Sequence, residues 1–226
     1  KRNRLRPYYI AVLIGGFILL AFHYFMAAIP FIDSTEADIA MFSSYDFLFN
    51  LNHLVSMAIF GILGAVMGTR FVIEEYSGAK AILLFSYPIS PKKMMSAKLW
   101  LVFGYSVAAM LLCGIVIGGV FFFSESLFPL CVDHLTWETI GWAFLSLLCH
   151  SLLAGAVALL SIWIGFFKKS IPVTIVTAVI AATILCQALS AAFSFRPVLF
   201  IVFGVAAIFT MAAVRSMFYQ VEKMEV

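Results

Sequence analysis

The chain has 226 residues, of which 64% are hydrophobic and only 11% are charged, and its net charge is +3. A water-soluble domain carries about 25% charged residues, so this composition excludes a soluble globular protein and indicates an integral membrane protein. The basic residues flank apolar segments, as Lys and Arg commonly do in membrane proteins. This distribution does not favour nucleic-acid binding.

Six apolar segments predict membrane-spanning helices. A spanning helix needs about 20 mostly apolar residues to cross a hydrocarbon core roughly 30 Å thick, and each of these segments lacks Asp, Glu, Lys and Arg. The segments do not show the short alternating pattern of a membrane barrel. In chain order the predicted spans are 8–28, 47–69, 99–123, 140–167, 171–192 and 197–214. We therefore expect an all-α integral membrane protein with one transmembrane domain over residues 1–226.

The first span follows the basic stretch KRNRLR, as the core of a secretory signal would. Its apolar part is too long for a signal core, and no convincing small-residue cleavage site follows it. We expect this span to be retained. Because the sequence opens on Lys rather than Met, we also expect further residues upstream.

Basic residues gather in alternate connections and predict the orientation. They precede span one, lie between spans two and three and between four and five, and follow span six; the remaining connections contain only Arg196. The two outer loops that precede spans two and four are acidic, with Asp33, Glu36, Asp38, Asp46, Glu125, Asp133 and Glu138. The positive-inside rule therefore places both termini and the connection between spans two and three in the cytoplasm.

No motif in the chain indicates catalysis or nucleotide binding. There is no Walker-type phosphate loop, no H-E-x-x-H and no G-x-S-x-G, so no cofactor is expected and any energy must come from another polypeptide. Three cysteines, Cys113, Cys149 and Cys186, fall within spans, where a thiol behaves as a small apolar group. Cys131 lies in an outer loop without an obvious partner.

Polar residues within the spans are few, and at that depth they face protein or a water-filled cavity. Three interpretations are open: hydrogen bonding between helices, a metal site made by the histidines, or the lining of a translocation path. The candidates are His23, Asn50, Asn52, His53, His150 and Gln187.

Small and aromatic residues suggest how the helices pack. Gly64 and Gly68 in span two, and Gly114 and Gly118 in span three, are spaced as in close helix contacts. The run Phe121–Phe123 at the outer end of span three is expected to be a cluster at the lipid interface.

Residues 74–98, EEYSGAKAILLFSYPISPKKMMSAK, form a polar stretch between spans two and three. Acids favour a helix N-terminus, so Glu74 and Glu75 predict the start of a short helix that runs to Ser86 on the cytoplasmic surface. Ser90 is expected as the N-cap of the next helix, with Pro91 in its first position. On this local pattern alone, the stretch could also be an interfacial linker that rests on lipid.

The order of residues from Phe71 to Lys98, after the second of six spans, resembles the coupling loop in the permeases of type-2 ABC transporters. The matching positions are Glu75, Gly78, Leu83, Leu84, Pro88, Ser90, Lys92, Lys93 and Lys98. The resemblance implies that this loop contacts an ATP-binding subunit. The residues expected to couple to the ATPase are Glu74, Glu75, Tyr76, Ser77, Gly78, Lys80, Leu84 and Pro88.

The same resemblance implies a nonenzymatic permease of the bacterial cytoplasmic membrane, surrounded by lipid and without a nucleic-acid partner. It would pair with a second permease, identical or different, and with two ATP-binding subunits that hold ATP and Mg. The compact chain and acidic outer loops are more similar to small bacterial permeases that export, or confer immunity to, antimicrobial and amphipathic peptides, including modulin exporters. We therefore expect export of such peptides or of lipid-like compounds. The connection between spans five and six is short, whereas several family members have a long extracellular excursion there, so what that element implies about an extracellular gate is not carried over to this chain.

Two other classes of function remain open from the sequence. One is an intramembrane enzyme built on His23, His53 and His150, which would bind metal or catalyse a reaction without an ATPase. The other is a nonenzymatic membrane sensor or scaffold for a kinase, which a neighbouring ATPase gene would argue against.

Overall fold

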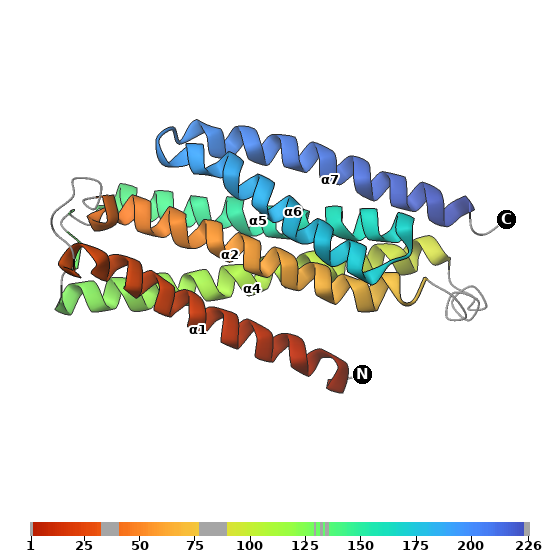
Figure 1. The fold of residues 1–226 in the computed structure, drawn as a ribbon, viewed down its shortest axis with the longest axis horizontal. Helices are drawn as coiled ribbons and strands as arrows, with labels where there is room; N and C mark the ends of the chain where they lie inside the picture. Colours follow the sequence, from red (N-terminus) through yellow and green to blue (C-terminus); the bar gives the residue numbers. More distant parts are fainter. Residues whose placement is uncertain are drawn as a thin grey trace.

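The computed structural model describes residues 2–32, 41–76, 90–128, 130–131, 133 and 136–223, with side chains from Leu5 onward. Six long helices lie alongside one another in an elongated bundle (Figure 1). All six are long and apolar enough to cross a membrane, and the described residues form no strand. The helices are α1 (Arg2–Ile32), α2 (Tyr45–Gly68), α4 (Pro91–Leu127), α5 (Trp137–Lys168), α6 (Ile171–Ser190) and α7 (Pro197–Lys223). Two short elements continue them: the π-helical turn η2 (Thr69–Ile73) after α2 and the 3₁₀ turn η3 (Ala191–Phe193) after α6.

The six predicted spans are confirmed as helices, but several helices are longer than their predicted windows. α4 begins at Pro91 instead of near residue 99, and α7 continues to Lys223 instead of ending near residue 214. A span predicted as a charge-free segment ends at the first Lys or Arg, whereas the helix itself continues into the polar interface of the membrane. Backbone hydrogen bonding, rather than side-chain polarity, decides where these helices end.

Specific residues mark the ends of three helices. Ser90 is the N-cap of α4 and Pro91 lies in its first turn, as predicted, although the Ser90 side chain makes no capping hydrogen bond. Lys169 follows the last residue of α5, and its φ of 48° is the left-handed conformation common after a helix C-terminus. Pro172 lies in the first turn of α6, which lets α6 begin directly after this turn.

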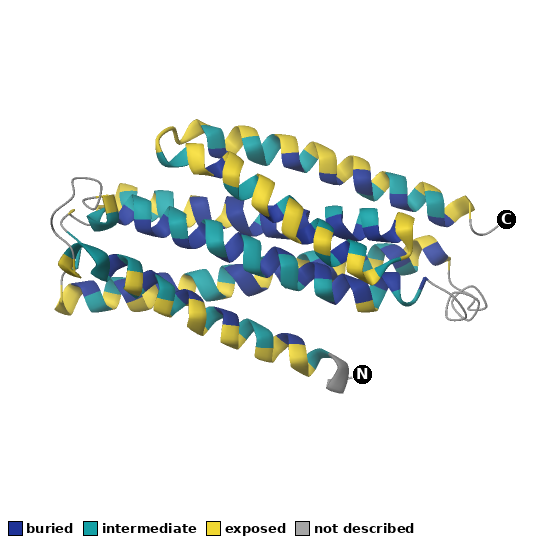
Figure 2. Ribbon diagram, viewed as in Figure 1, coloured by how far each residue is buried: buried dark blue, intermediate teal, exposed yellow. Residues whose placement is uncertain are grey.

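α2 and α5 form the centre of the bundle. In the most apolar stretch of α5, 72% of the residues are buried, against 61% in α2 and 22% or less in α1, α6 and α7. α5 contacts α2, α4, α6 and α7, whereas α1 rests on α2 and α4. Figure 2 shows buried residues where helices face one another and exposed residues around the outside. One chain therefore leaves most of its outer helices facing lipid or other subunits.

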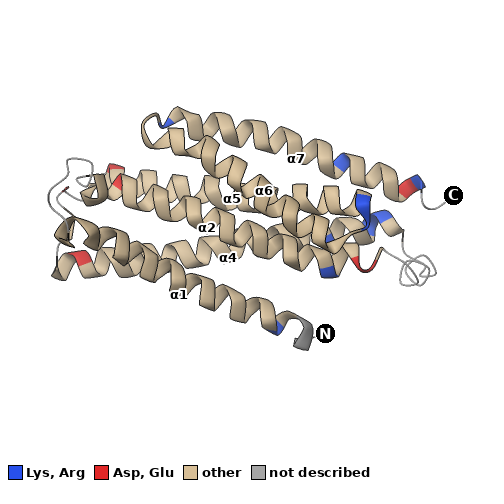
Figure 3. Cartoon of the chain, viewed as in Figure 1, with Lys and Arg blue, Asp and Glu red and all other residues tan. Residues whose placement is uncertain are grey.

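The bundle has two chemically different ends. Both termini lie at one end, which we call the terminal end, together with η2 and the α5–α6 turn (Figure 1). The opposite, distal end holds the start of α2, the end of α4 and the α6–α7 connection. Apart from Arg196, the described Lys and Arg residues lie toward the terminal end, whereas acidic residues occur at both ends (Figure 3).

Glycines allow α2, α4 and α5 to approach closely. A Cβ atom added at Gly64 would lie 1.9 Å from Ser106 Oγ, and one at Gly68 or Gly114 would come within 2.2 or 2.4 Å of a side chain on α5. These three positions confirm the close contacts predicted from the spacing of small residues. Gly118 differs, because a Cβ there would have its nearest contact at 3.6 Å, an ordinary packing distance.

Candidate functional site

The first buried polar group joins α1 to α2. Asn52 Nδ2 donates to the Leu19 carbonyl oxygen at 3.2 Å and lies 3.1 Å from His23 Nδ1. Asn52 Oδ1 accepts from the Ser56 hydroxyl at 3.1 Å. Because a carbonyl oxygen can only accept, the Leu19 contact fixes the orientation of the Asn52 amide. Asn52 therefore also donates to His23 Nδ1, and the neutral His23 ring carries its proton on Nε2.

Aromatic rings surround the other edge of His23. Its Nε2 atom is buried and has no polar partner among the described residues. The ring centroids of Phe49 and Phe121 lie 5.2 and 4.4 Å from that of His23. Phe121 is completely buried, whereas Phe123 is 70% exposed. The prediction of a lipid-interface cluster over 121–123 is therefore wrong for Phe121, because that side chain faces α1 and α2 inside the bundle.

The second buried polar group joins α2 to α5. Asn50 Nδ2 donates to the Asp46 carbonyl oxygen at 2.8 Å, and the Ser146 hydroxyl donates to Asn50 Oδ1 at 2.6 Å. Ser146 Oγ also lies 3.3 Å from the Nδ1 atoms of both His53 and His150. His150 Nδ1 is 2.8 Å from the Ser146 carbonyl oxygen. These contacts connect the start of α2 to the middle of α5.

The order of these hydrogen bonds assigns the protons. The Asp46 carbonyl takes the Asn50 amide hydrogen, so Asn50 Oδ1 faces Ser146 and receives the hydroxyl proton. Ser146 Oγ can then only accept, which requires a proton on His53 Nδ1. Neither His53 nor His150 forms an ion pair within the described residues, and a buried charge without a partner is costly. We therefore assign His53 as a neutral ring with a lone pair on Nε2.

Five of the six predicted path residues belong to these two groups, which both lie in the distal half of the bundle. Gln187 does not, because its side chain is exposed on α6. It lies about 140° around that helix from the buried Ala182, at 100° per residue. Sequence reasoning missed Ser56 and Ser146, although each lies one helical turn from a predicted polar residue, which is the spacing that could have indicated them.

The histidines do not form a metal site within the described part of the chain. No three His, Cys, Asp or Glu side chains come together there in an arrangement that could hold a metal ion. His53 and His150 have ring centroids 6.0 Å apart, but His23 is bonded to Asn52 in the other group. A structural or catalytic zinc site needs at least three protein ligands.

Polar contacts also fasten the distal end. Arg196 forms ion pairs with Asp46 and, at 3.6 Å, with Glu138, and its guanidinium lies 4.8 Å from the centroid of the Trp142 ring. These contacts tie the α6–α7 connection to the starts of α2 and α5.

The carboxylate of Glu125, at the end of α4, fastens the adjacent connection. Its Oε2 accepts from the Tyr45 hydroxyl at 3.0 Å and its Oε1 from the Leu130 backbone amide at 2.9 Å. Burial and the nearby charges of Glu125 and Asp133 raise the pKa of the Cys131 thiol to about 12. Cys131 is therefore protonated at neutral pH and is a poor nucleophile.

The predicted coupling residues follow the end of α2. The Glu74 amide donates to the Thr69 carbonyl oxygen at 2.9 Å, which closes the wide turn of η2, and the Tyr76 amide donates to the Val72 carbonyl oxygen at 3.1 Å. The predicted coupling helix therefore does not begin at Glu74, because Glu74 and Glu75 follow a helix C-terminus. The remainder of the predicted segment, including Ser77, Gly78, Lys80, Leu84 and Pro88, lies outside the described residues.

Four residues hold the end of α2 against the start of α4, and we call them the α2–α4 clasp: Glu75, Tyr76, Pro91 and Lys98. Lys98 Nζ lies 2.8 Å from Glu75 Oε2 and 4.6 Å from the centroid of the Tyr76 ring. The Tyr76 hydroxyl donates to the Pro91 carbonyl oxygen at 3.1 Å. Burial raises the pKa of this hydroxyl well above its usual value, so it stays a donor. The clasp joins the two sides of segment 77–89.

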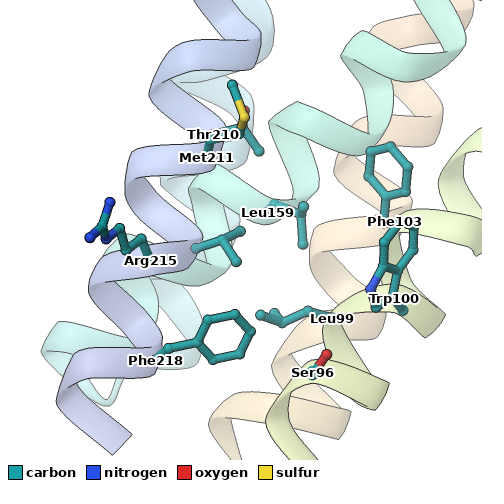
Figure 4. A pocket seen from close by; sticks show the side chains of 10 residues that line it. Ser96, Leu99, Trp100, Phe103, Leu159, Thr210, Met211, Arg215 and Phe218 are labelled. Atoms are coloured by element: carbon teal, nitrogen blue, oxygen red, sulfur yellow. The ribbon is translucent and has the colours of Figure 1, made fainter. Parts of the chain in front are cut away.

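A groove of about 390 Å³ lies between α4 and α7, with Leu159 of α5 at its floor (Figure 4). Its lining is apolar except for Ser96, Thr210 and Arg215. Trp100, on the α4 side, is 70% exposed. This groove opens on the outside of the bundle.

Comparison with known proteins agrees with this architecture. A model of the family described as "ABC-2 family transporter protein" matches residues 1–185. The protein named "Uncharacterized protein YcbO" of Bacillus subtilis (strain 168) is 29% identical over 219 residues, covering 96% of this chain and 94% of that protein. No solved structure matches. With six spanning helices and a family match over most of its length, this chain belongs to the ABC-2 family of transporter proteins and is a multi-pass protein of the cell membrane.

Proposed function

We propose that this chain is the permease subunit of an ATP-driven exporter. It pairs with a second permease, identical or different, and with two ATP-binding subunits that bind ATP and Mg²⁺. Membership of the ABC-2 family supports association with ATP-binding subunits in general. The segment between α2 and α4, which resembles a coupling loop, is the part of the chain that would contact them.

The terminal end faces the cytoplasm in this proposal. The described Lys and Arg residues are concentrated there, apart from Arg196 at the distal end (Figure 3), and basic connections remain on the cytoplasmic side during insertion. This orientation places segment 77–89 where soluble ATP-binding subunits can reach it.

The α2–α4 clasp is the observation that carries the proposal. Glu75 and Tyr76 precede segment 77–89, and Pro91 and Lys98 follow it, so a force on the segment acts on α2 and α4 together. α2 also carries Asn50, Asn52 and His53 in the distal half. ATP can shift the equilibrium between two conformations of the transporter only by binding them with different affinity. The clasp offers the mechanical route by which this shift passes from the ATPase through α2 to those polar groups.

The substrate in this proposal is an amphipathic or antimicrobial peptide, or a lipid-like compound. The two polar groups of the distal half line its path, because they are hydrogen-bonding side chains placed within an apolar, aromatic environment. α6 exposes Gln187 together with most of its outer face, and a second permease subunit would cover such a surface.

Co-purification tests the proposal. Gly78→Trp and Glu75→Lys are each expected to reduce recovery of the ATP-binding subunit with this chain at least tenfold, while the six spans still insert. Glu75→Lys also breaks the clasp, so a matched variant must separate the two effects: in Glu75→Lys/Lys98→Glu the ion pair is reversed but preserved.

The double variant decides which role Glu75 has. If Glu75 acts only within the clasp, the reversed pair restores both ATPase recovery and transport. If Glu75 also contacts the ATPase, recovery stays low. Retention of the ATP-binding subunit and full transport by Gly78→Trp and by Glu75→Lys would contradict the proposed coupling role.

A further inference from the structure

A cavity of about 220 Å³ lies between α2, α4 and α5 in the distal half of the bundle. The aromatic rings of Phe49, Phe122 and Phe144 form part of its wall, together with aliphatic side chains such as Leu147. Among the described residues that line it, His53 provides the only polar side chain. A mostly apolar cavity with a precisely placed polar group is the usual form of a small-molecule site.

His53 offers a hydrogen-bond acceptor to this cavity. The side chain is 4% exposed. Its Nδ1–H donates to Ser146 Oγ, with 3.3 Å between the two heavy atoms. The other edge of the ring carries the Nε2 lone pair, and no described residue makes a hydrogen bond to it. A neutral imidazole nitrogen without a hydrogen accepts one hydrogen bond, so a ligand in the cavity that donates one hydrogen bond could use this lone pair.

Glycines on α4 create the space. A Cβ atom added at Gly119 would meet no atom within 4 Å, and one at Gly118 would have its nearest contact at 3.6 Å. Gly119, Ile115 and Phe144 are exposed at the edge of the cavity. The cavity therefore opens between α4 and α5 toward the hydrocarbon of the bilayer, so a ligand would enter from the membrane.

We propose that this cavity binds a neutral, apolar molecule with a single hydrogen-bond donor, of which a phenol is the simplest example. The ring or alkyl part contacts the aromatic wall, and the hydroxyl donates to His53 Nε2. The Nε2 lone pair selects a donor, and the apolar wall disfavours an ion. The site belongs to one chain and goes beyond the proposed export, because binding requires no ATPase.

The test uses the full chain in phospholipid nanodiscs, with 4-fluorophenol and 4-fluorotoluene as probes followed by ¹⁹F NMR. 4-Fluorophenol is expected to show saturable binding, and 4-fluorotoluene, which has no donor, to bind about five- to tenfold more weakly. This ratio corresponds to one hydrogen bond of about 1–1.4 kcal/mol.

Two variants examine the two parts of the site. His53→Asn keeps a donor near Ser146 but removes the acceptor at the Nε2 position, so 4-fluorophenol should weaken to the level of 4-fluorotoluene. Gly119→Leu fills the cavity and should abolish saturable binding of both probes. Gly104→Leu is the control, since Gly104 is also on α4, has no atom within 4 Å of an added Cβ and does not line the cavity.

Several results would overturn the proposal. Equal affinity of both probes, unchanged by His53→Asn, would mean that the cavity is an apolar crevice filled by lipid acyl chains. Unchanged binding in Gly119→Leu would place the probes elsewhere. Absence of saturable binding of 4-fluorophenol to the unaltered chain would remove the site altogether.

Discussion

α5 and α7 are both long, apolar helices, but they occupy opposite places in the bundle. In the most apolar stretch of α5 72% of the residues are buried, against 22% in α7. α5 contacts four other long helices, whereas α7 contacts mainly α5. Apolar length therefore predicts that a helix spans the membrane, but it does not predict whether that helix faces protein or lipid.

The size and polarity of individual side chains explain the difference. The buried residues of α5 include the small run Ala154–Ala158 and hydroxyl residues such as Ser151 and Ser161, whereas α7 exposes large residues such as Ile208 and Phe209. Lipid chains are as apolar as leucine, so burial against another helix is favoured where small residues allow close packing. α5 is the helix against which α2, α4, α6 and α7 pack.

A substitution at the contact between α5 and α6 tests this role of α5 directly and is expected to cost the most stability. In Gly165→Leu the new Cβ atom would lie 1.8 Å from Thr174 Oγ1 and 3.3 Å from Thr174 Cα, so α6 must move away from α5. We expect destabilisation of about 3 kcal/mol, measured by thermal unfolding in detergent, because overpacking against backbone cannot be relieved by a rotamer change. Gly204→Leu on α7 is the matched control, since its added Cβ meets no atom within 4 Å.

Equal losses in these two variants would contradict the distinction between the centre and the periphery. A large loss in Gly204→Leu alone would indicate that α7 packs against a second subunit at that position.

The second expected effect is smaller and concerns the polar contact between α2 and α5. Ser146→Ala removes the donor to Asn50 Oδ1 and the acceptor from His53 Nδ1. An unsatisfied buried polar group costs about 1–3 kcal/mol, although hydrogen bonds between membrane helices average about 0.6 kcal/mol. We expect a loss of about 1 kcal/mol in the same unfolding assay.

Ser126→Ala is the control for Ser146→Ala. Ser126 is exposed and, within the described part of the chain, donates only to the Phe123 carbonyl oxygen on its own helix. Removal of its hydroxyl should leave stability within about 0.5 kcal/mol of the unaltered chain. If Ser146→Ala leaves stability unchanged but alters substrate-stimulated ATPase activity, the polar group acts in transport rather than in holding the helices together.

The sequence predicts the spans and most of the polar residues within them, but not their partners. Charge-free apolar windows identify all six helices, because the bilayer sets their length. Periodicity shows which residues share a helix face, yet it does not show which helix that face meets. The sequence therefore does not indicate the role of Ser146, and it predicts a lipid-facing Phe121 where the structure buries that side chain. Gln187 was included for its polarity alone, although it lies on the exposed face of α6.

The coupling stretch illustrates the same limit. Its acids favour a helix N-terminus by their charge, but Glu75 lies after a helix end and is stabilised by Lys98, which follows much later in the chain. A local rule was overridden by a contact between α2 and α4. Ser90 and Pro91, by contrast, were predicted correctly because an N-cap and a first-turn proline depend only on neighbouring residues.

The smallest changes in stability are expected at two ion pairs at the terminal end. The Lys98–Glu75 pair joins α4 to the end of the central helix α2, and its two side chains are 17% and 31% exposed. The Lys92–Glu222 pair joins α4 to the peripheral helix α7, and its two side chains are 50% and 49% exposed. An exposed pair gains little because water and salt screen it. Lys92→Ala should therefore change stability by less than about 0.5 kcal/mol, whereas Lys98→Ala, which also removes the contact with the Tyr76 ring, should cost about 0.5–1 kcal/mol. Unfolding measured at low and high salt checks both values, since only a screened pair loses its contribution as salt increases. If Lys92→Ala lost more stability than Lys98→Ala, α7 would be attached to α4 as strongly as α2 is. The distinction between a central and a peripheral helix would then not hold at the terminal end, where the ATPase is proposed to act.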